Sequence, residues 1–417
     1  MSEAVREVEV VVVGAGPAGL AAAVALASAG VETALVAPAA RPDDWRTSAL
    51  LAGSVEFLRS IAAWDRLAPF AAPLRRIRLV DDTARLFRGP EIVFDAAEIG
   101  LPTFGWNVPN RDLVRELEAL GAGLPRLARV LASAERIAFE ADAGIVATEA
   151  GTLRARLVVG ADGRGSAVRQ AAGIGTRTWS YDQAALVTNF SHTAPHDDVS
   201  TEFHGPAGPF TVVPLAPGRS SLVWVERPGR AEALRELPEA ELAREIERRS
   251  HAIVGAVTID APRQVFPLSG LTAHRTALGR AALVGEAAHA LPPIGAQGLN
   301  LGLRDVAALA EIVSRRPSGT DPGAAAVTEA YERRRRADVT LRTAGVDLLN
   351  RSLLSDLLPV QLVRAAGLEA LRLAAPLRRL LMREGTLPGT ALPALVGGLL
   401  PRGERERRRL RSGARFG

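Results

Sequence analysis

The chain has 417 residues, which is enough for two or three domains with a sizeable core. It contains no cysteine, so disulfides, thiolate catalysis and cysteine-ligated metal sites are excluded, and we expect no metal centre. All 51 basic residues are arginine and lie scattered along a chain with only 4% aromatic residues, which argues against a nucleic-acid partner.

The first predicted element is a short β-branched strand at Val8 to Val13, of the kind found inside parallel sheets. A glycine-rich turn follows, and Leu20 to Ala29 then has the pattern of a helix. This order is the context in which a GxGxxG turn binds a dinucleotide: Gly14 makes the tight turn, Gly16 admits the pyrophosphate and Gly19 allows close packing. The residues predicted to form the turn are Gly14, Ala15, Gly16, Pro17, Ala18 and Gly19.

The second predicted strand, Thr33 to Val36, lacks the acid that usually binds the adenosine ribose at its end. Ala37 and Pro38 stand there instead. Asp43 and Asp44 lie downstream and are candidates for the contact, as are backbone groups and water.

A further predicted strand, Leu157 to Gly160, leads into Asp162 and Gly163. Asp-Gly alone favours any turn. Its significance here is its place between the N-terminal turn and the motif described next.

The late block, Leu283 to Asp305, has the most informative pattern in the chain. It predicts a strand end, an acid after glycine, a Pro-Pro turn, a glycine-rich loop and a helix starting near Leu299. Such a loop lets backbone N–H groups approach a flat ligand, the helix directs its positive end at that ligand, and the acid can accept hydrogen bonds from hydroxyls. The candidate binding residues of the block are Gly285, Glu286, Pro292, Gly295, Ala296, Gln297, Gly298, Leu299 and Asn300.

His289, the single histidine of this block, is its obvious titratable residue and the one candidate for a catalytic role. An imidazole behind such a loop is more often a hydrogen-bonded structural group than a base.

Together the three motifs resemble the aromatic-hydroxylase (class A) flavoprotein monooxygenases, which carry them in this order. Four segments narrow the resemblance to the hydroxylases of ubiquinone biosynthesis, and the similarity covers about residues 6 to 400. These segments are Trp45 to Leu58, Gly208 to Leu215, Gly295 to Leu309 and Tyr331 to Asp338. The chain departs from the class at Glu286, where the class has Asp, and at Ala37.

The resemblance implies a monooxygenase that hydroxylates a polyprenylated phenol through a flavin C4a-hydroperoxide. It implies FAD as cofactor, O2 as co-substrate, and NAD(P)H or another external electron donor. The FAD is expected to be non-covalent, because no cysteine offers a covalent link. Arg46, Arg111 and the Asp162-Gly163 turn match cofactor contacts of the family. A soluble aromatic substrate, or a flavin-binding scaffold of a biosynthetic complex, stays open as an alternative.

The expected fold class is α/β, with a Rossmann-like FAD domain interleaved with a β-rich substrate domain, plus C-terminal helices. Residues 1–72, 103–175 and 268–345 are assigned to the FAD domain. Residues 73–102 and 176–267 are assigned to the substrate domain, and 346–417 to the C-terminal helical region.

The segment Val346 to Arg383 is rich in leucine, with Arg364, Arg372, Arg378 and Arg379 among its basic residues. This pattern fits either core-facing helices or a basic amphipathic surface lying on a membrane. We find no signal peptide and no apolar run of membrane-spanning length. We therefore expect a cytoplasmic protein, with a peripheral position on the inner face of the cytoplasmic membrane and contact with a ubiquinone-biosynthesis complex as open alternatives.

Overall fold

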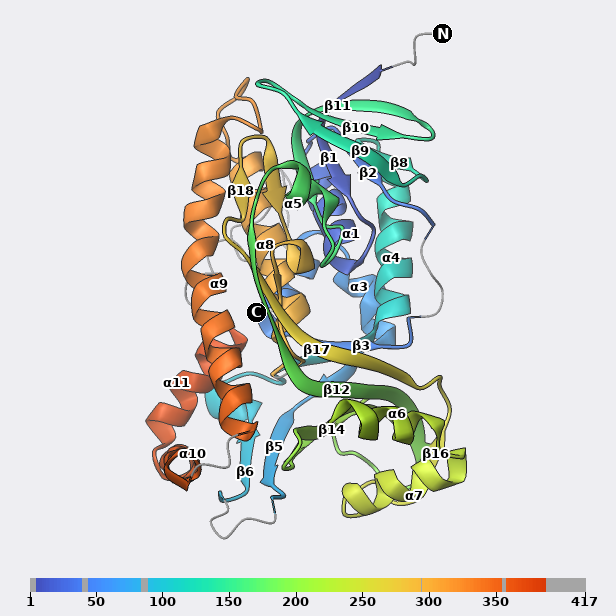
Figure 1. Ribbon diagram of the computed structural model, residues 1–417, viewed down its shortest axis with the longest axis vertical. Helices are drawn as coiled ribbons and strands as arrows, with labels where there is room; N and C mark the ends of the chain where they lie inside the picture. The colour runs from blue at the N-terminus through green and yellow to red at the C-terminus, as the bar shows by residue number, and fades with distance from the viewer. Residues whose placement is uncertain (1–4, 40–43, 84–88, 294, 355–357, 388–417) are drawn as a thin grey trace, which may run out of the picture.

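The computed structural model describes residues 5–39, 44–83, 89–293, 295–354 and 358–387. Two large sheets form the two ends of the molecule, and a small third sheet lies between them (Figure 1). Long helices run beside the first sheet, and short helices cover the second.

The first sheet has the strand order β18-β19-β11-β1-β2-β8, with β10 paired to β11 and β9 paired to β10. The strands β19, β11, β1, β2 and β8 are parallel, and residues 10–13 of β1 are buried, as their unbroken valine run predicts. The strands are β1 (Val5–Val13), β2 (Thr33–Val36), β8 (Leu127–Val130), β9 (Ala134–Phe139), β10 (Gly144–Thr148), β11 (Gly151–Gly160), β18 (Ala277–Leu278) and β19 (Ala281–Leu283).

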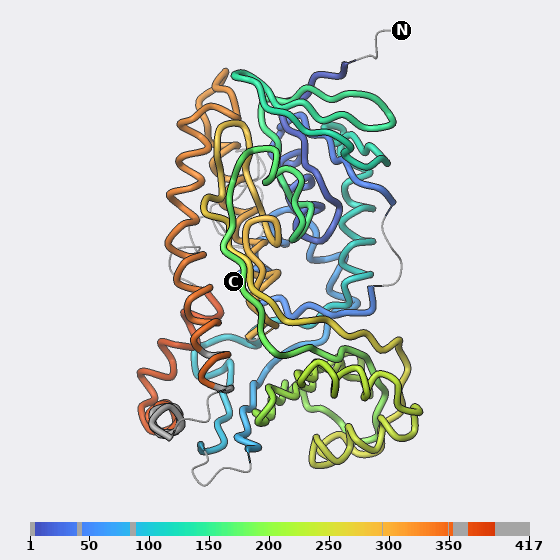
Figure 2. Tube along the Cα trace, in the orientation of Figure 1, coloured from blue at the N-terminus to red at the C-terminus, as the bar shows by residue number. Residues whose placement is uncertain are grey.

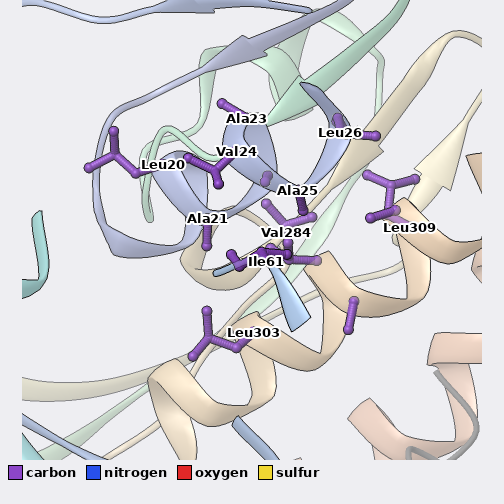
Figure 3. Packing of buried hydrophobic residues seen from close by; sticks show 14 of the residues in the cluster. Leu20, Ala21, Ala23, Val24, Ala25, Leu26, Ile61, Val284, Leu303 and Leu309 are labelled. Carbon is purple, nitrogen blue, oxygen red and sulfur yellow. The ribbon is translucent and has the colours of Figure 1, made fainter. Parts of the chain in front are cut away.

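Helices α1 and α8 pack against each other within the core of this end. The small alanine side chains of α1 allow the two helices to approach closely. Figure 3 shows Leu20 and Val24 of α1 in the same cluster as Leu303 of α8 and Val284. The helices around this sheet are α1 (Pro17–Ser28), α2 (Ala52–Ser60), α3 (Trp64–Leu67), α4 (Asn110–Ala122), α5 (Ala167–Ala171), α8 (Gln297–Ser314) and α9 (Ala325–Leu354).

The second sheet has the order β20-β17-β12-β15-β14-β13-β5-β6, with β16 also paired to β12. Helices α6 (Pro228–Glu236) and α7 (Glu239–Arg249) pack on it over a core that includes Phe190, Phe210 and Trp224. The strands are β5 (Arg76–Asp81), β6 (Ile92–Asp95), β12 (Thr176–His192), β13 (Val199–His204), β14 (Pro209–Pro214), β15 (Arg219–Glu226), β16 (Val257–Ile259), β17 (Gln264–Ala273) and β20 (His289–Ala290).

The third sheet connects the two ends and consists of β3 (Thr47–Leu51), β7 (Gly105–Pro109) and β4 (Ala72–Leu74). The Thr47 and Ser221 hydroxyls lie 3.0 Å apart, and Asn107 Nδ2 donates to the Pro214 carbonyl at 2.9 Å. The described residues also include three short 3-10 turns: η1 (Ala68–Phe70) and η2 (Ala96–Ile99) near this sheet, and η3 (Gly285–Ala287) after β19.

The α/β fold class is confirmed, whereas the domain boundaries stay a proposal. Positions 176 and 268 fall in β12 and β17, the two long strands that pass from one end of the molecule to the other (Figure 2). Position 346 falls inside α9, so that helix continues from the proposed FAD domain into the C-terminal region.

The described C-terminal helices are α10 (Leu358–Leu373) and α11 (Ala375–Thr386). Helix α11 packs on η2, with Met382 buried in the same cluster as Phe94 and Phe104. Among the described residues, no helix combines the length and the apolar character that crossing a membrane requires.

Candidate active site

The three sequence motifs meet at one edge of the first sheet. Gly160, the last residue of β11, pairs with Val13 of β1 on one side and with Leu283 of β19 on the other. Because these strands are parallel, their carboxyl ends lie together, and each of the three motifs follows one of them. Ligands of open α/β sheets bind at such an edge.

The glycines of the N-terminal turn have different roles. A Cβ on Gly14 would lie 2.3 Å from the Ala161 carbonyl oxygen, and one on Gly19 would lie 1.9 Å from the Gly14 oxygen, so both positions require glycine for packing. A Cβ on Gly16 would meet no atom within 4 Å. Gly16 is the N-cap of α1, and no side chain caps the N–H groups of the first turn. An anion such as a pyrophosphate fits this helix end.

The adenosine end of the site differs from the family pattern. Ala37 is buried at the end of β2, and Arg129 donates to the carbonyls of Ala37 at 2.8 Å and Pro38 at 3.0 Å. Sequence reasoning missed Arg129, which reaches this place from β8, the strand next to β2.

Asp44 is bound by neighbours rather than free for a ribose. It accepts two hydrogen bonds from the Arg46 guanidinium, both at 2.8 Å, one from the Arg46 backbone N–H at 3.1 Å and one from Asn110 at 3.0 Å. Burial raises the pKa of Asp44, but the pairing with Arg46 outweighs it and holds that pKa below its ordinary value. Asp43 lies outside the described residues.

The structure places the two predicted arginines differently. Arg46 follows β2 and lies near enough to Glu286 for their charges to interact, and its guanidinium is 5.2 Å from the Phe266 ring. Arg111 stacks on Trp45 at 4.6 Å and lines a cleft of about 260 Å³ at the junction of the two ends. The cofactor contact of Arg111 stays a prediction.

The middle motif presents an unsatisfied acceptor. One oxygen of Asp162 accepts a hydrogen bond from the Val168 N–H at 3.2 Å, while the other is buried with no partner among the described residues. Gly163 adopts a φ of +78°, which favours glycine. A buried carboxylate oxygen without a partner is costly, so a hydroxyl of a bound ligand fits this position.

In the late block, Gly285 has a φ of +60° and its N–H donates to Asp305 at 3.0 Å. Glu286 is 58% exposed, and its nearest cation is Arg164 at 3.7 Å. Its carboxylate is therefore available to a ligand, although it stands where the wider class has the shorter Asp.

The N-terminus of α8 is suited to bind a negatively charged group. Ala296, its N-cap, has a φ of +54° and makes no side-chain cap, which leaves the first N–H groups of the helix unpaired within it. The backbone is open at Gly295 in the loop before it and at Gly298 in its first turn, where a Cβ would meet nothing within 4 Å. Pro292 is buried and precedes this loop.

The side chains of two predicted binding residues form hydrogen bonds with other parts of the protein. Asn300 accepts from the Leu51 N–H at 2.8 Å and from Ser54 at 2.7 Å, and it donates to the Ala49 carbonyl. Gln297 donates to the Gly295 carbonyl. We therefore propose that Gln297, Leu299 and Asn300 act on a ligand through backbone N–H groups.

His289 lies behind the loop. Its Nε2 is 2.6 Å from Asp305 Oδ2, and both side chains are fully buried. We propose a structural role for His289, because its side chain is fully buried and its Nε2 is paired with Asp305.

The donors and acceptors at this edge match FAD. The N-termini of α1 and α8 suit its negatively charged parts, and the acids Asp162 and Glu286 suit its hydroxyls. When bound, FAD supplies the redox and oxygen chemistry.

Comparison with known proteins agrees with this geometry. A family model described as an FAD binding domain matches residues 7–344. Ubiquinone hydroxylase UbiL of Rhodospirillum rubrum is 40% identical and covers 94% of this chain and 93% of its own. The 3-demethoxyubiquinol 3-hydroxylase of Escherichia coli is 35% identical and covers 89% and 96%.

Solved structures share the fold at lower identity. The p-nitrophenol 4-monooxygenase PnpA of Pseudomonas putida has a TM-score of 0.73 at 21% identity, covering 94% of this chain and 98% of its own. HpxO of Klebsiella pneumoniae, solved with FAD and uric acid, has a TM-score of 0.73 at 19% identity, covering 92% and 97%.

The predicted family, enzyme class and cofactor are confirmed by these matches. The chain belongs to the ubiquinone-biosynthesis hydroxylases within the FAD-dependent aromatic hydroxylases, and it is an FAD-dependent monooxygenase.

Proposed function

We propose that this enzyme hydroxylates the aromatic ring of a polyprenylated phenol in ubiquinone biosynthesis. The support is the similarity to two ubiquinone-pathway hydroxylases, one of them matched over 404 residues, which is more of the chain than the FAD-binding domain occupies.

In this proposal the residues of the chain would bind and orient the cofactor, which would supply the oxygen chemistry. The uncapped start of α8 and its helix dipole stabilise negative charge on the reduced flavin. Asp162 and Glu286 accept hydrogen bonds from cofactor hydroxyls. We assign no residue as catalytic base.

The observation that favours a lipid substrate is a set of exposed leucines, three on α11 and one at the end of α10. Leu373 is 68% exposed, Leu380 65%, Leu381 52% and Leu377 47%. We call these four residues the leucine row. Arg379 and Arg383 are exposed on the same helix. Apolar side chains interspersed with arginine suit the surface of an anionic bilayer, where each arginine adds about 1 kcal/mol at most.

The inner side of the C-terminal helices is core. Leu368 and Leu371 pack partly buried against the cluster around Phe94, and Met382 is buried in it. Both interpretations of the leucine-rich segment therefore have support in the described residues, each on a different side of the helices.

Arg378 belongs to the inner side. It donates to Glu98 at 2.6 Å and to the carbonyls of Leu371 and Arg372. A charge reversal at Arg378 would break this contact, so a test of membrane binding has to use Arg379 and Arg383.

The experiment that tests the substrate is the identification of quinone intermediates in a strain lacking this gene. We expect an intermediate that lacks one ring hydroxyl to accumulate and to disappear when the wild-type gene is restored. The Gly16→Val variant, which is expected not to bind FAD, should fail to restore it. An unchanged quinone profile in the deletion strain would favour a soluble aromatic substrate. Rescue by Gly16→Val would favour a scaffold.

Membrane contact is tested by co-sedimentation with anionic vesicles at low and high salt. We expect the wild-type protein to sediment at low salt and the Arg379→Glu/Arg383→Glu variant to stay in the supernatant. The matched control is Arg126→Glu/Arg136→Glu, the same charge change on exposed arginines near β8 and β9, at the far end of the molecule. Equal binding of all three proteins, or wild-type protein that never sediments, would contradict a role for the leucine row.

A further inference from the structure

Helices α8 and α9 enclose a cluster of charged side chains in the interior. Its members are Arg304 and Asp305 of α8 and Arg335 and Asp338 of α9, each no more than 8% exposed. We call these four residues the ionic cluster. Arg335 donates to Asp305 at 2.6 Å and to Asp338 at 2.8 Å, and Arg304 donates to Asp338 at 3.2 Å.

The cluster holds the late block at two points. Asp305 Oδ2 accepts from the Gly285 N–H at 3.0 Å and lies 2.6 Å from His289. Arg304 Nη2 donates to the side-chain oxygen of Gln297 at 3.3 Å. The first contact precedes the glycine-rich loop and the second follows it, so the loop is held from both ends.

On its other side the cluster reaches α11 through Arg342 of α9. Arg342 Nε donates to Asp338 at 3.3 Å, and its Nη2 donates to the Glu384 backbone carbonyl at 2.8 Å and to the Glu384 side chain at 3.2 Å. Asp338 therefore accepts hydrogen bonds from three guanidinium groups. Glu384 lies on the helix that carries three members of the leucine row.

The charges in the cluster depend on one another. Burial raises the pKa of Asp338, but Arg304, Arg335 and Arg342 outweigh burial and hold that pKa below its ordinary value. Burial lowers the pKa of Arg304 to about 10. Loss of one partner leaves another charge buried without compensation, so a change at one end of the cluster alters the contacts at the other.

We propose that Asp338 and Arg342 are positioning residues, which fix the glycine-rich loop before α8 through Arg304 and Gln297. The geometry of that loop then depends on how α11 packs against Arg342. The proposal uses FAD binding and does not depend on the substrate or on membrane contact. Neither residue belongs to the cofactor edge, and the contacts connect them to it through Asp338–Arg304–Gln297.

A double-mutant cycle on FAD affinity tests the proposal. The variants are Arg342→Met, Gln297→Ala and the two combined, and the measurement is the dissociation constant of FAD from the purified protein. We expect each single change to raise the constant at least about fivefold. Because both changes interrupt the same chain of contacts, the combined variant should lie close to the larger single effect rather than at the product of the two.

The matched control is Arg333→Met, the same change on the same helix, where the arginine is 70% exposed and 3.6 Å from Glu329. It should leave FAD affinity and the visible spectrum of the bound flavin unchanged, whereas Arg342→Met should alter both. Should Arg342→Met fold poorly, Arg342→Lys replaces it in the cycle: it keeps the charge beside Asp338 but cannot reproduce the guanidinium contacts to both Asp338 and Glu384. The proposal would be overturned if the effects of the two single changes on the FAD dissociation constant multiply in the combined variant. It would also be overturned by an Arg342 variant whose FAD affinity and spectrum match those of Arg333→Met.

Discussion

The ionic cluster and the leucine row invert the usual distribution of side chains in opposite ways. Between α8 and α9, four charged residues are buried, whereas beside α11 four leucines face solvent. Buried charges and large exposed apolar groups are both uncommon in soluble proteins. The two regions are joined by Arg342, which touches Asp338 on one side and Glu384 on the other.

The two regions differ in whether the unusual side chains have partners within the protein. In the cluster, both carboxylates have cationic partners and several hydrogen bonds, so the described residues account for the buried acids. In the leucine row, each residue keeps between 47% and 68% of its surface exposed. We infer that the ionic cluster positions the protein's own glycine-rich loop, and that the leucine row contacts a surface outside the molecule.

The largest effect should follow from breaking the cluster at its centre. Asp338→Ala removes the partner of three guanidinium groups, and loss of one member of a buried ion pair costs about 3–5 kcal/mol. The measurement is the free energy of unfolding in urea. Glu329→Ala, an exposed acid on the same helix, should change it by less than about 0.5 kcal/mol. Comparable values for the two variants would mean that the cluster is not a source of stability.

The late block also contains a charge outside the cluster, and it should behave in the opposite way. Glu286→Ala should weaken FAD binding by about 1.5–3 kcal/mol, because charge-assisted hydrogen bonds are lost. The stability of the FAD-free protein should stay the same, since Glu286 is exposed and has no cation nearer than 3.7 Å. Titration with FAD and urea unfolding of the FAD-free protein measure the two effects. Wild-type FAD affinity in the variant would show that this carboxylate does not contact the cofactor.

Acid should weaken the cluster and spare the leucine row. Although burial raises the pKa of Asp338, its three arginine partners hold that pKa below the ordinary value of 3.8. A lowered folded-state pKa means that the carboxylate contributes stability above about pH 3.8, and that this contribution is lost as the pH falls through the folded-state value. Each unit of pKa difference corresponds to about 1.4 kcal/mol.

Unfolding free energies from pH 7 to pH 3 measure this contribution. The difference in unfolding free energy between the wild type and Asp338→Asn should become smaller below about pH 4. A difference that stays constant over the whole range would contradict a stabilising role of the Asp338 carboxylate.

The smallest effect on stability should come from the leucine row. Changing Leu377, Leu380 and Leu381 to serine alters exposed positions, so each change should move the unfolding free energy by no more than about 0.5 kcal/mol. FAD content should be retained, while sedimentation with anionic vesicles should fall. A marked loss of stability, measured in urea, would instead place the three leucines in a packed interface.

Sequence reasoning predicted what depends on neighbouring residues along the chain. The GxGxxG turn, the Asp-Gly turn and the late block each follow a strand, and parallel strands bring their ends together, so the FAD-binding edge could be foreseen. The long-range contacts could not. Arg129 binds the backbone carbonyls of Ala37 and Pro38 from a strand about ninety residues away, and its place shows only when β8 is paired with β2.

The ionic cluster was hidden for a similar reason. The run Arg333-Arg334-Arg335-Arg336 looks like a solvated face, yet Arg335 alone in it is buried, because it points at Asp305 of α8. Asn300 is predicted to meet the cofactor through its backbone N–H, and its side chain fastens α8 to β3 and α2, which the sequence pattern did not indicate. In both cases the decisive partner lies on another element, which periodicity does not reveal.

The flavin content of the wild-type protein and of Gly16→Val tests the central claim most directly. A Cβ at Gly16 points into open space, so the variant should fold while its side chain occupies the approach to the helix end. We predict that folded wild-type protein releases about one FAD per chain on denaturation, identified by chromatography. The folded variant should release none and should not take up added FAD. Folded wild-type protein that is colourless and ignores added FAD, or a Gly16→Val variant that binds FAD as the wild type does, would contradict the account.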